Sequence, residues 1–474
     1  MTRRLSAVLP ASAPVGVLAG ALLLCCAVSA PAQQGGEGYP QRPHADARGD
    51  LTVALTGDAI ITRELRVYGE PGFRRLRRII READLGFTNL EVLFHDYGPE
   101  MIPQEESGGT YMRADPELAR ELAWMGFDVV SRANNHTMDF GPGGMRSTTR
   151  AVEEAGLAHA GAGENLAEAC EPAYVETAAG RVALISVAST FDDFMRAGAQ
   201  RMDMRGRPGL CPLRYERTYR VPREDLEELA RIRGGLFDWA DGEAGDTVHF
   251  FDGRFVASGG GYGRSSRVHP GDAARVLARI RDAGRQAKFV LVNSHTHEGG
   301  EGEYAPAEFF RDFARRAVEA GADAVVVEGP HVLRGVEIHR GRPIFHSLGN
   351  FLFQNETVLR QPTDNYRPYG LPPYTALPGH FQDTRIDESG GGFPADAEYW
   401  ESAVAEVVFS GGEPAEIRLH PVTLGYGLHR SVRGRPVLAE GDLARRILAD
   451  LEERSAPFGT DLAVEDGVGV IDLR

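Results

Sequence analysis

Short apolar runs alternate with segments of helical periodicity along residues 51–348. Each run is about as long as a buried strand, and the segments between them repeat apolar residues every three or four positions. We expect strands at 51–56, 85–90, 127–131, 182–188, 289–293 and 324–327, and helices at 73–82, 116–125, 144–155, 272–287 and 306–320. Strands that alternate with helices predict an α/β fold with a parallel sheet.

The pattern changes towards the C-terminus, where apolar runs follow one another without a helix between them. Residues 332–338 and 344–348 flank Arg340-Gly341, which predicts a hairpin. Residues 403–409 and 415–419 predict a second pair of strands. We therefore expect the sheet to end with antiparallel strands.

Two stretches interrupt this rhythm. Residues 190–268 are rich in arginine, glycine and acidic residues, and residues 354–400 are rich in proline, glycine and tyrosine. We interpret both as insertions in one domain that covers residues 50–425, and expect residues 426–474 to pack on that domain or complete it. Long insertions in enzymes often line the active site.

The first 32 residues have the three parts of a secretory signal peptide. Arg3 and Arg4 form the positive region, residues 15–28 form the apolar run, and Ala30-Pro31-Ala32 is a cleavage site. The polar residues 33–49 are expected to form a disordered linker. The sequence thus predicts a secreted or periplasmic protein, or a membrane-anchored one if the segment stays uncleaved.

The net charge of the chain argues against one class of partner, and its cysteine content predicts a disulfide. The chain has 474 residues and a net charge of −16, which argues against a nucleic-acid partner because phosphate contacts need a basic surface. Two of the four cysteines lie in the predicted signal peptide, which leaves Cys170 and Cys211. In a secreted chain we expect these two to form a disulfide, with two free thiols as the alternative.

Polar side chains follow several of the expected strands directly. The carboxyl ends of strands in α/β sheets are where binding sites form. The residues in question are Asp58, Glu91, Asn135, His136, His295, His297 and His331. Such a set of carboxylate, amide and imidazole groups suits one or two divalent ions of Mn, Fe or Zn, which activate water for hydrolysis.

The sequence lacks the motifs of several other classes of catalytic site. The sequence has no G-x-S-x-G nucleophile elbow and no Gly-Lys pair for a phosphate-binding P-loop. His297-Glu298 is followed by Glu301 where a zinc protease of the H-E-x-x-H type needs its second histidine. No pair of carboxylates marks a retaining glycosidase.

Six motifs occur in an order that resembles the CapA family, which is named for poly-γ-glutamate capsule synthesis and has a calcineurin-like metallophosphatase fold. The resemblance covers about residues 51–355. The motifs are Leu55-Thr56-Gly57-Asp58, Thr88-Asn89-Leu90-Glu91, Ala133-Asn134-Asn135-His136 with Asp139 and Gly141, Ser294-His295-Thr296-His297-Glu298, Gly329-Pro330-His331-Val332, and Pro343 to Phe351 with Ser347-Leu348-Gly349-Asn350-Phe351.

The resemblance implies a four-layer αββα sandwich with metal-binding loops at the strand ends. It implies carboxylate ligands at Asp58 and Glu91, an amide ligand at Asn135, and imidazole ligands at His331 and at His295, His297 or both. His136 is implied as the catalytic histidine, assisted by Asn135. Asn89, Asn134 and Asn350 are implied as substrate contacts.

The sequence departs from the metallophosphatase pattern at two positions. Asp58-Ala59-Ile60 lacks the histidine of the usual D-x-H motif, and Glu328 stands where the last motif has a histidine. Glutamate is still a ligand for hard metals, so Glu328 is expected to join a site with altered metal preference or with a single ion.

Two functions remain open at this point. The first is a secreted hydrolase in which a metal-bound hydroxide attacks a phosphoester or an anionic envelope polymer. The second is a non-catalytic protein that binds an anionic capsule polymer for export or anchoring. Capsule-synthesis membrane proteins are expected partners in either case.

Overall fold

The computed structural model describes residues 49–107, 109–237, 242, 245–251, 253–302, 304–389 and 393–474. The predicted signal peptide, and the predicted linker up to residue 48, lie outside the described residues. Within the described part of the chain, no helix is both long enough and apolar enough to cross a membrane.

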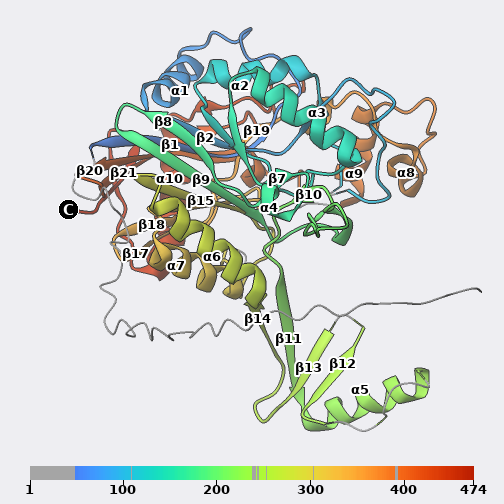
Figure 1. The fold of residues 1–474 in the computed structure, drawn as a ribbon. Helices are drawn as coiled ribbons and strands as arrows, with labels where there is room; N and C mark the ends of the chain where they lie inside the picture. Colours follow the sequence, from blue (N-terminus) through green and yellow to red (C-terminus); the bar gives the residue numbers. More distant parts are fainter. Residues whose placement is uncertain are drawn as a thin grey trace, which may run out of the picture. The chain divides into compact units, whose positions relative to one another are not determined.

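Two large β-sheets form the centre of the fold (Figure 1). The first runs in the order β23 (Ala463–Glu465), β24 (Val468–Asp472), β21 (Glu413–Thr423), β20 (Glu401–Ser410), β1 (Leu51–Ile60), β2 (Leu85–Leu90), β5 (Val129–Ser131) and β6 (Ala158–Ala160), with β19 (Asn350–Phe353) beside β1 and β22 (Val437–Leu438) beside β21. The second runs in the order β17 (Val336–His339), β18 (Arg342–Phe345), β16 (Ala324–Glu328), β15 (Phe289–His295), β9 (Gly180–Ala188) and β8 (Ala173–Thr177).

The strands at the centre of each sheet are parallel. In the first sheet β19, β1, β2, β5 and β6 are parallel, and in the second sheet β9, β15, β16 and β18 are parallel. The strands β20 and β21 pair antiparallel, as the sequence predicts for the C-terminal part. The arrangement brings the carboxyl ends of β1, β2, β5, β15 and β16 to one side of the fold.

Apolar residues alternate between two faces of each sheet and so build three layers of core. Val53 and Leu55 of β1 pack against Leu291 of β15 in the core between the sheets, while Ala54 of β1 faces the opposite way. The outer face of the first sheet is covered by α1 (Pro71–Glu82), α2 (Ala119–Met125) and α3 (Gly141–Glu154), and that of the second by α6 (Pro270–Gly284) and α7 (Glu308–Ala320). The protein is therefore a four-layer αββα sandwich, as the sequence resemblance implies.

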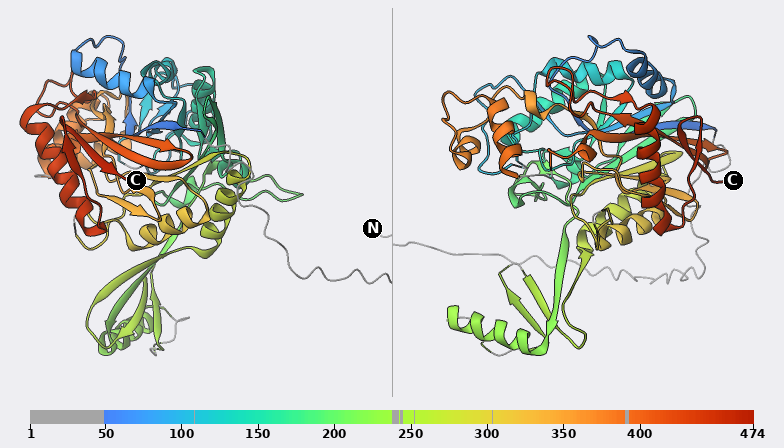
Figure 2. Two further views of the ribbon diagram at one scale, coloured as in Figure 1. Left: turned by 90° about the vertical axis from the view of Figure 1, so that its left-hand side faces the viewer. Right: turned by 180° about the vertical axis from the view of Figure 1, so that it is seen from behind.

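The first insertion contains regular structure that the sequence pattern did not reveal. It forms a separate sheet in the order β12 (Thr247–Phe250), β13 (Gly253–Ser258), β11 (Tyr215–Pro222) and β14 (Gly263–Val268), with α5 (Arg223–Leu236) packed on it (Figure 2). Val221, Leu226, Ala230 and Val248 form its small core. Its strands were missed because few of their residues are apolar and their exposed residues are mostly arginine.

The second insertion and the C-terminal segment both lie against the first sheet. The insertion carries α8 (Thr363–Tyr366), α9 (Pro378–Ser389) and short 3-10 turns at Asn355–Thr357, Arg367–Tyr369 and Ala397–Trp400. The C-terminal segment adds α10 (Gly441–Ser455) and a 3-10 turn at Ala456–Phe458, and ends in β23 and β24. Ile447 and Leu448 of α10 are buried in the core between the sheets.

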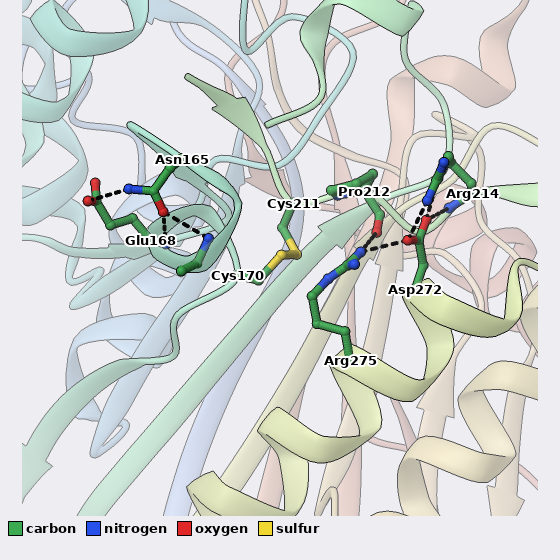
Figure 3. The surroundings of a disulfide bond; sticks show 9 residues. Asn165, Glu168, Cys170, Cys211, Pro212, Arg214, Asp272 and Arg275 are labelled. Carbon is green, nitrogen blue, oxygen red and sulfur yellow. Dashed lines mark hydrogen bonds and ion pairs between the residues drawn. A yellow bond between two sulfur atoms is a disulfide. The ribbon is translucent and has the colours of Figure 1, made fainter. Parts of the chain in front are cut away.

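A disulfide joins Cys170, at the end of α4 (Leu166–Ala169), to Cys211, which follows β10 (Gly209–Leu210) (Figure 3). Their Cα atoms are 5.0 Å apart and 41 residues separate them in sequence. β10 pairs with β7 (Ala162–Gly163), so the disulfide reinforces the same contact. Next to it, Asp272 of α6 accepts hydrogen bonds from Arg214 and Arg275.

Candidate metal centre

Asp58 lies inside β1 rather than after it, which corrects the expected end of this strand at Thr56. β1 continues to Ile60 because its last residues pair with β19, with Asp58 opposite Asn350. The pairing register shifts at Asp58/Ala59, which marks a bulge. Gly57 is required at this point, because a Cβ there would lie 1.7 Å from the carbonyl oxygen of Gly349.

Glu91 follows β2 and is fully buried. Among the described residues, neither of its carboxylate oxygens has a hydrogen-bond partner. Instead, its Oε1 faces the Nε2 atoms of His295 at 3.6 Å, His331 at 3.8 Å and His136 at 3.9 Å. A buried carboxylate without a partner is costly, so this cluster has the form of a site that a cation completes.

His295 and His331 each lie between the two carboxylates. Both imidazoles turn Nδ1 towards Asp58, at 3.7 Å for His295 and 3.3 Å for His331, and turn Nε2 towards Glu91. His331 also shares a 2.9 Å hydrogen bond with Asn350. The two rings are therefore held in orientations that direct one nitrogen of each towards the same carboxylate.

The backbone around His331 is held in an unusual conformation. His331 has a φ of 61°, in the left-handed region that few non-glycine residues adopt. Gly329, two residues earlier, is needed for close packing, since a Cβ there would lie 2.7 Å from the ring of His297. These two features explain the Gly329-Pro330-His331 motif by geometry.

His297 contributes a further imidazole, so the structure brings His295 and His297 to the same place. Their Nε2 atoms are 2.9 Å apart. Among the described residues, Glu91, His297 and His331 each offer one ligand atom within 4.8 Å of the others. The backbone N–H of His297 donates to Thr190, which fixes the loop after β15.

His136 is oriented by a neighbouring acid. Its Nδ1 shares a 2.8 Å hydrogen bond with Asp139, and this leaves Nε2 to face Glu91. Asp139 also accepts the backbone N–H of Met112. The preceding Asn134 accepts the N–H of His136 and donates to the carbonyl of Leu90, so the loops after β5 and β2 are joined.

The other amide residues have two roles: Asn89 and Asn350 hydrogen-bond to neighbouring groups, whereas Asn135 has an oxygen available to a metal ion. Asn89 donates to Asp58 at 2.7 Å and lies 3.1 Å from Nδ1 of His295. Asn350 donates to the backbone carbonyl of Tyr399. Asn135 is buried and its carbonyl oxygen has no hydrogen-bond partner, which leaves that oxygen available as a ligand.

Glu328 ends β16 and is fully buried, and the structure engages one of its carboxylate oxygens while Oε1 has no hydrogen-bond partner among the described residues. It accepts a hydrogen bond from Asn293, which in turn accepts one from Ser186, and Ser186 shares a hydrogen bond with Ser131. No histidine lies within ion-pair distance of Glu328 among the described residues. This chain of polar groups crosses from one sheet to the other beneath the metal centre.

The electrostatics of the cluster call for positive charge. Burial alone would raise the pKa of Asp58, but hydrogen bonds to His295 and His331 outweigh it and hold that pKa well below its usual range. Burial, and then the charge of Asp58, raise the pKa of Glu91 well above its usual value. Burial would lower the pKa of His331, yet Glu91 and Asp58 raise it to about 9. The two carboxylates therefore favour a positive charge between them.

The residues present fit a divalent ion. Ligand atoms that share one ion at about 2.0–2.2 Å are separated by roughly 2.9–3.6 Å. The nitrogen and oxygen atoms around Glu91 are separated by 2.9–3.9 Å, close to this range. Glu91, His295, His297 and His331 can hold such an ion, with Asp58 and Asn135 beside them.

Three supporting residues were not singled out from the sequence. Asn293 sits mid-strand in an apolar run and gives no local signal. Thr190 starts an insertion with no recognisable motif. Phe393 stacks on His331 with ring centroids 4.7 Å apart, but it comes from the second insertion, far away in sequence. Asp139, by contrast, could be found from the sequence, because it follows His136 by three residues.

Comparison with known proteins supports the reading of these motifs. A profile of the bacterial capsule synthesis protein PGA_cap family matches residues 47–355. The uncharacterized protein y4sH of Sinorhizobium fredii is 38% identical over 434 residues, which cover 89% of this chain and 93% of that protein. The capsule biosynthesis protein CapA of Bacillus anthracis is 26% identical over 311 residues, covering 64% of this chain and 60% of that protein.

A solved structure was also matched. The 5'-nucleotidase precursor from Thermus thermophilus aligns with a TM-score of 0.33 and 14% identity, over 85% of this chain and 58% of that chain. The family assignment does not depend on it, because the profile match spans all six motifs and every candidate ligand from Asp58 to His331. The chain belongs to the bacterial capsule synthesis protein PGA_cap family.

Proposed function

We propose that the protein is an exported, metal-dependent hydrolase that acts on an anionic ester, with phosphoesters as the first class to test. The observation that carries this proposal is the buried carboxylate of Glu91, which has no hydrogen-bond partner and faces the Nε2 atoms of three histidines. A structural core would not bury such a group without compensation.

Glu91, His295, His297 and His331 would hold the ion, and Asp58 would complete the charge balance. A divalent ion there supplies Lewis acidity to an ester oxygen and lowers the pKa of a water molecule. His295 and His331 are fixed by Asp58 through Nδ1, which keeps their Nε2 atoms directed inward. Phe393 covers one face of His331 and limits the access of water from that side.

His136 is suited to proton transfer. Asp139 holds the Nδ1 side of its ring, so a proton on Nε2 points into the cluster, where it can pass to a leaving group. The amide of Asn135 has a free carbonyl oxygen next to this position. These residues would supply the acid and the orientation for the reaction.

The test combines metal analysis with turnover. The full chain is purified without chelator, loaded in turn with Mn, Fe and Zn, and assayed on bis(p-nitrophenyl) phosphate, p-nitrophenyl phosphate and poly-γ-glutamate. We expect Glu91→Gln to lose the metal and the activity together. We expect His136→Ala to keep the metal and lose about 100-fold in kcat.

The control is His339→Ala, which removes a histidine from the hairpin at the opposite end of the second sheet. It should keep both metal and activity. Failure of the wild-type chain to take up any of the three metals would contradict the proposal. Binding of the polymer without turnover would instead favour the non-catalytic alternative.

A further inference from the structure

A groove of about 1090 Å³ lies beside the metal centre, where the first insertion leaves the sandwich. β11 begins at Tyr215, three residues before its first pairing with β13 at Thr218, so its edge along Tyr215–Arg217 is open on that side. The groove occupies this open edge. Its inner wall contains Ser189, Thr190 and Glu298, and its outer wall contains residues of β11, β12 and β13.

The inner wall is tied to the candidate metal ligands. Thr190 accepts the backbone N–H of His297 at 2.8 Å, and Glu298 is the next residue along. Glu298 accepts hydrogen bonds from the hydroxyls of Ser189 and Thr190. Tyr215 begins the outer wall and is fixed by stacking on Phe309 of α7, with centroids 4.2 Å apart. A chain bound in the groove would therefore end next to His297.

Two arginines of the groove form no ion pair with an acidic side chain among the described residues. Arg214 and Arg267 are neutralised by Asp272 and Glu216. The guanidinium of Arg217 donates to the hydroxyl of Tyr215 and lies over its ring, and Arg254 donates to the hydroxyl of Thr218 at 2.9 Å. In a chain with a net charge of −16, guanidinium groups that are not ion-paired in a groove are a specific feature. They can form paired hydrogen bonds with carboxylate or phosphate groups.

The groove is also lined by aromatic side chains. Phe191, Phe250, Phe251 and Phe255 join Tyr215 and Tyr219 in its walls. Phe255 stacks on Tyr219 with centroids 5.1 Å apart, and Phe251 has 78% of its surface exposed. Exposed aromatic rings provide flat apolar surfaces on which the C–H faces of sugar rings pack. A flexible chain of carboxylates alone would gain little from them.

We propose that this groove binds an acidic glycan, a sugar chain that carries carboxylate groups, and holds it beside the metal centre. The inference rests on the proposed function, because it identifies the part of the substrate that extends away from the scissile ester. Arg217 and Arg254 bind its anionic groups, and Phe251 with its neighbours packs against its rings. The groove thus determines specificity and takes no part in the chemistry.

The test measures binding of a galacturonic acid oligomer of defined length to the metal-loaded full chain by calorimetry. We expect the double variant Arg217→Gln/Arg254→Gln to weaken binding at least about 30-fold, and Phe251→Ala to weaken it about fivefold. The matched controls are Arg281→Gln, an exposed arginine of α6, and Tyr374→Ala, an exposed aromatic residue with 95% of its surface accessible. Both should bind within twofold of wild type.

Three results would overturn the inference. The first is unchanged binding of the oligomer by the groove variants. Another is poly-L-glutamate or single-stranded DNA binding more tightly than the oligomer. The third is equal binding of a neutral maltose oligomer. Hydrolysis of bis(p-nitrophenyl) phosphate separates this inference from the proposed function. If the wild-type chain binds the glycan but does not hydrolyse this ester, the hydrolase proposal alone is rejected. If it hydrolyses the ester but does not bind the glycan, the groove proposal alone is rejected.

Discussion

Asp139 and His136 are joined by a 2.8 Å hydrogen bond between a carboxylate oxygen and Nδ1, and both side chains are buried. This contact fixes which ring nitrogen of His136 faces Glu91. Among the described residues, the Asp139 carboxylate hydrogen-bonds to His136 and to the backbone of Met112 and acts on Glu91 through its charge, so it acts as a positioning residue. Its effect on the reaction can be separated from its effect on metal binding.

We expect Asp139→Asn to lower kcat about 10- to 100-fold with little change in metal content, because the asparagine keeps the shape but fixes the imidazole less well. Steady-state kinetics and metal analysis of the same preparation check this. The pH–rate profile should also shift, which a purely structural defect would not produce. Equal losses of metal and activity would contradict the positioning role.

Metal binding should stabilise the fold, because the ion neutralises Asp58 and Glu91 where both are buried. At a metal concentration 100 times the Kd, the gain is about 3 kcal/mol in the free energy of unfolding. Thermal denaturation with and without chelator measures it. In Glu91→Gln we expect no response to chelator, whereas Glu465→Gln, an exposed control on β23, should respond as wild type does.

The Asp272 cluster predicts a pH-dependent contribution to stability. Burial would raise the pKa of Asp272, but hydrogen bonds from Arg214 and Arg275 outweigh it and lower that pKa to about 2. A lowered pKa in the folded state means that the contribution is complete above the unfolded value near 4 and disappears as the pH falls towards 2. Asp272→Asn should therefore cost about 1–2 kcal/mol at pH 7, a value reduced because Arg214 is partly exposed to solvent.

Denaturant titrations at pH 7 and at pH 3 test this. The difference between Asp272→Asn and wild type should shrink at the lower pH. The exposed Asp466, in the turn between β23 and β24, provides the control variant Asp466→Asn. A difference that stays constant between the two pH values would show that the aspartate contributes through shape rather than charge.

The disulfide closes a loop of 41 residues, for which the chain-entropy estimate of stabilisation is about 4 kcal/mol. The double variant Cys170→Ser/Cys211→Ser should accordingly have a lower Tm, and wild type treated with reductant should match it. Metal content should not change, since neither cysteine contacts the candidate ligands. A Tm that does not respond to reductant would rule out this contribution.

The apolar periodicity predicted the strands and helices of the α/β core well because the central strands are buried on both faces, whereas the four-layer sandwich was implied by the family resemblance. Leu85–Leu90 and Phe289 to Asn293 are mostly apolar and fully buried, and each belongs to a central parallel strand. α10 and the strands β11 to β14 were not predicted. The apolar residues of β11 to β14 are few and depend on long-range partners, as when Val221 packs with Leu226 and Val248. α10 does carry apolar residues at helical spacing, among them Ile447, Leu448 and Leu451, and this signal was overlooked.

The candidate site was partly visible in the sequence for a similar reason. Asp58, Glu91, His295 and His331 follow apolar runs, and parallel strands bring such residues together. The sequence could not show that one carboxylate oxygen of Glu328 accepts a hydrogen bond from Asn293. It could not show either that Phe393, from a distant insertion, packs on His331. Both depend on the distance between sheets and on loop paths that no local pattern records.

The part of the first insertion that forms the separate sheet, residues 215–268, starts and finishes at neighbouring positions: Tyr215 pairs with Val268, and the backbone N–H of His269 donates to the carbonyl of Arg214 at 2.7 Å. A short peptide could therefore bridge Arg214 and His269 without moving the sandwich. The module is replaceable as a unit, by gene recombination or by design. An exchange of this module would replace the outer wall of the groove and leave the strands that carry the candidate ligands in place.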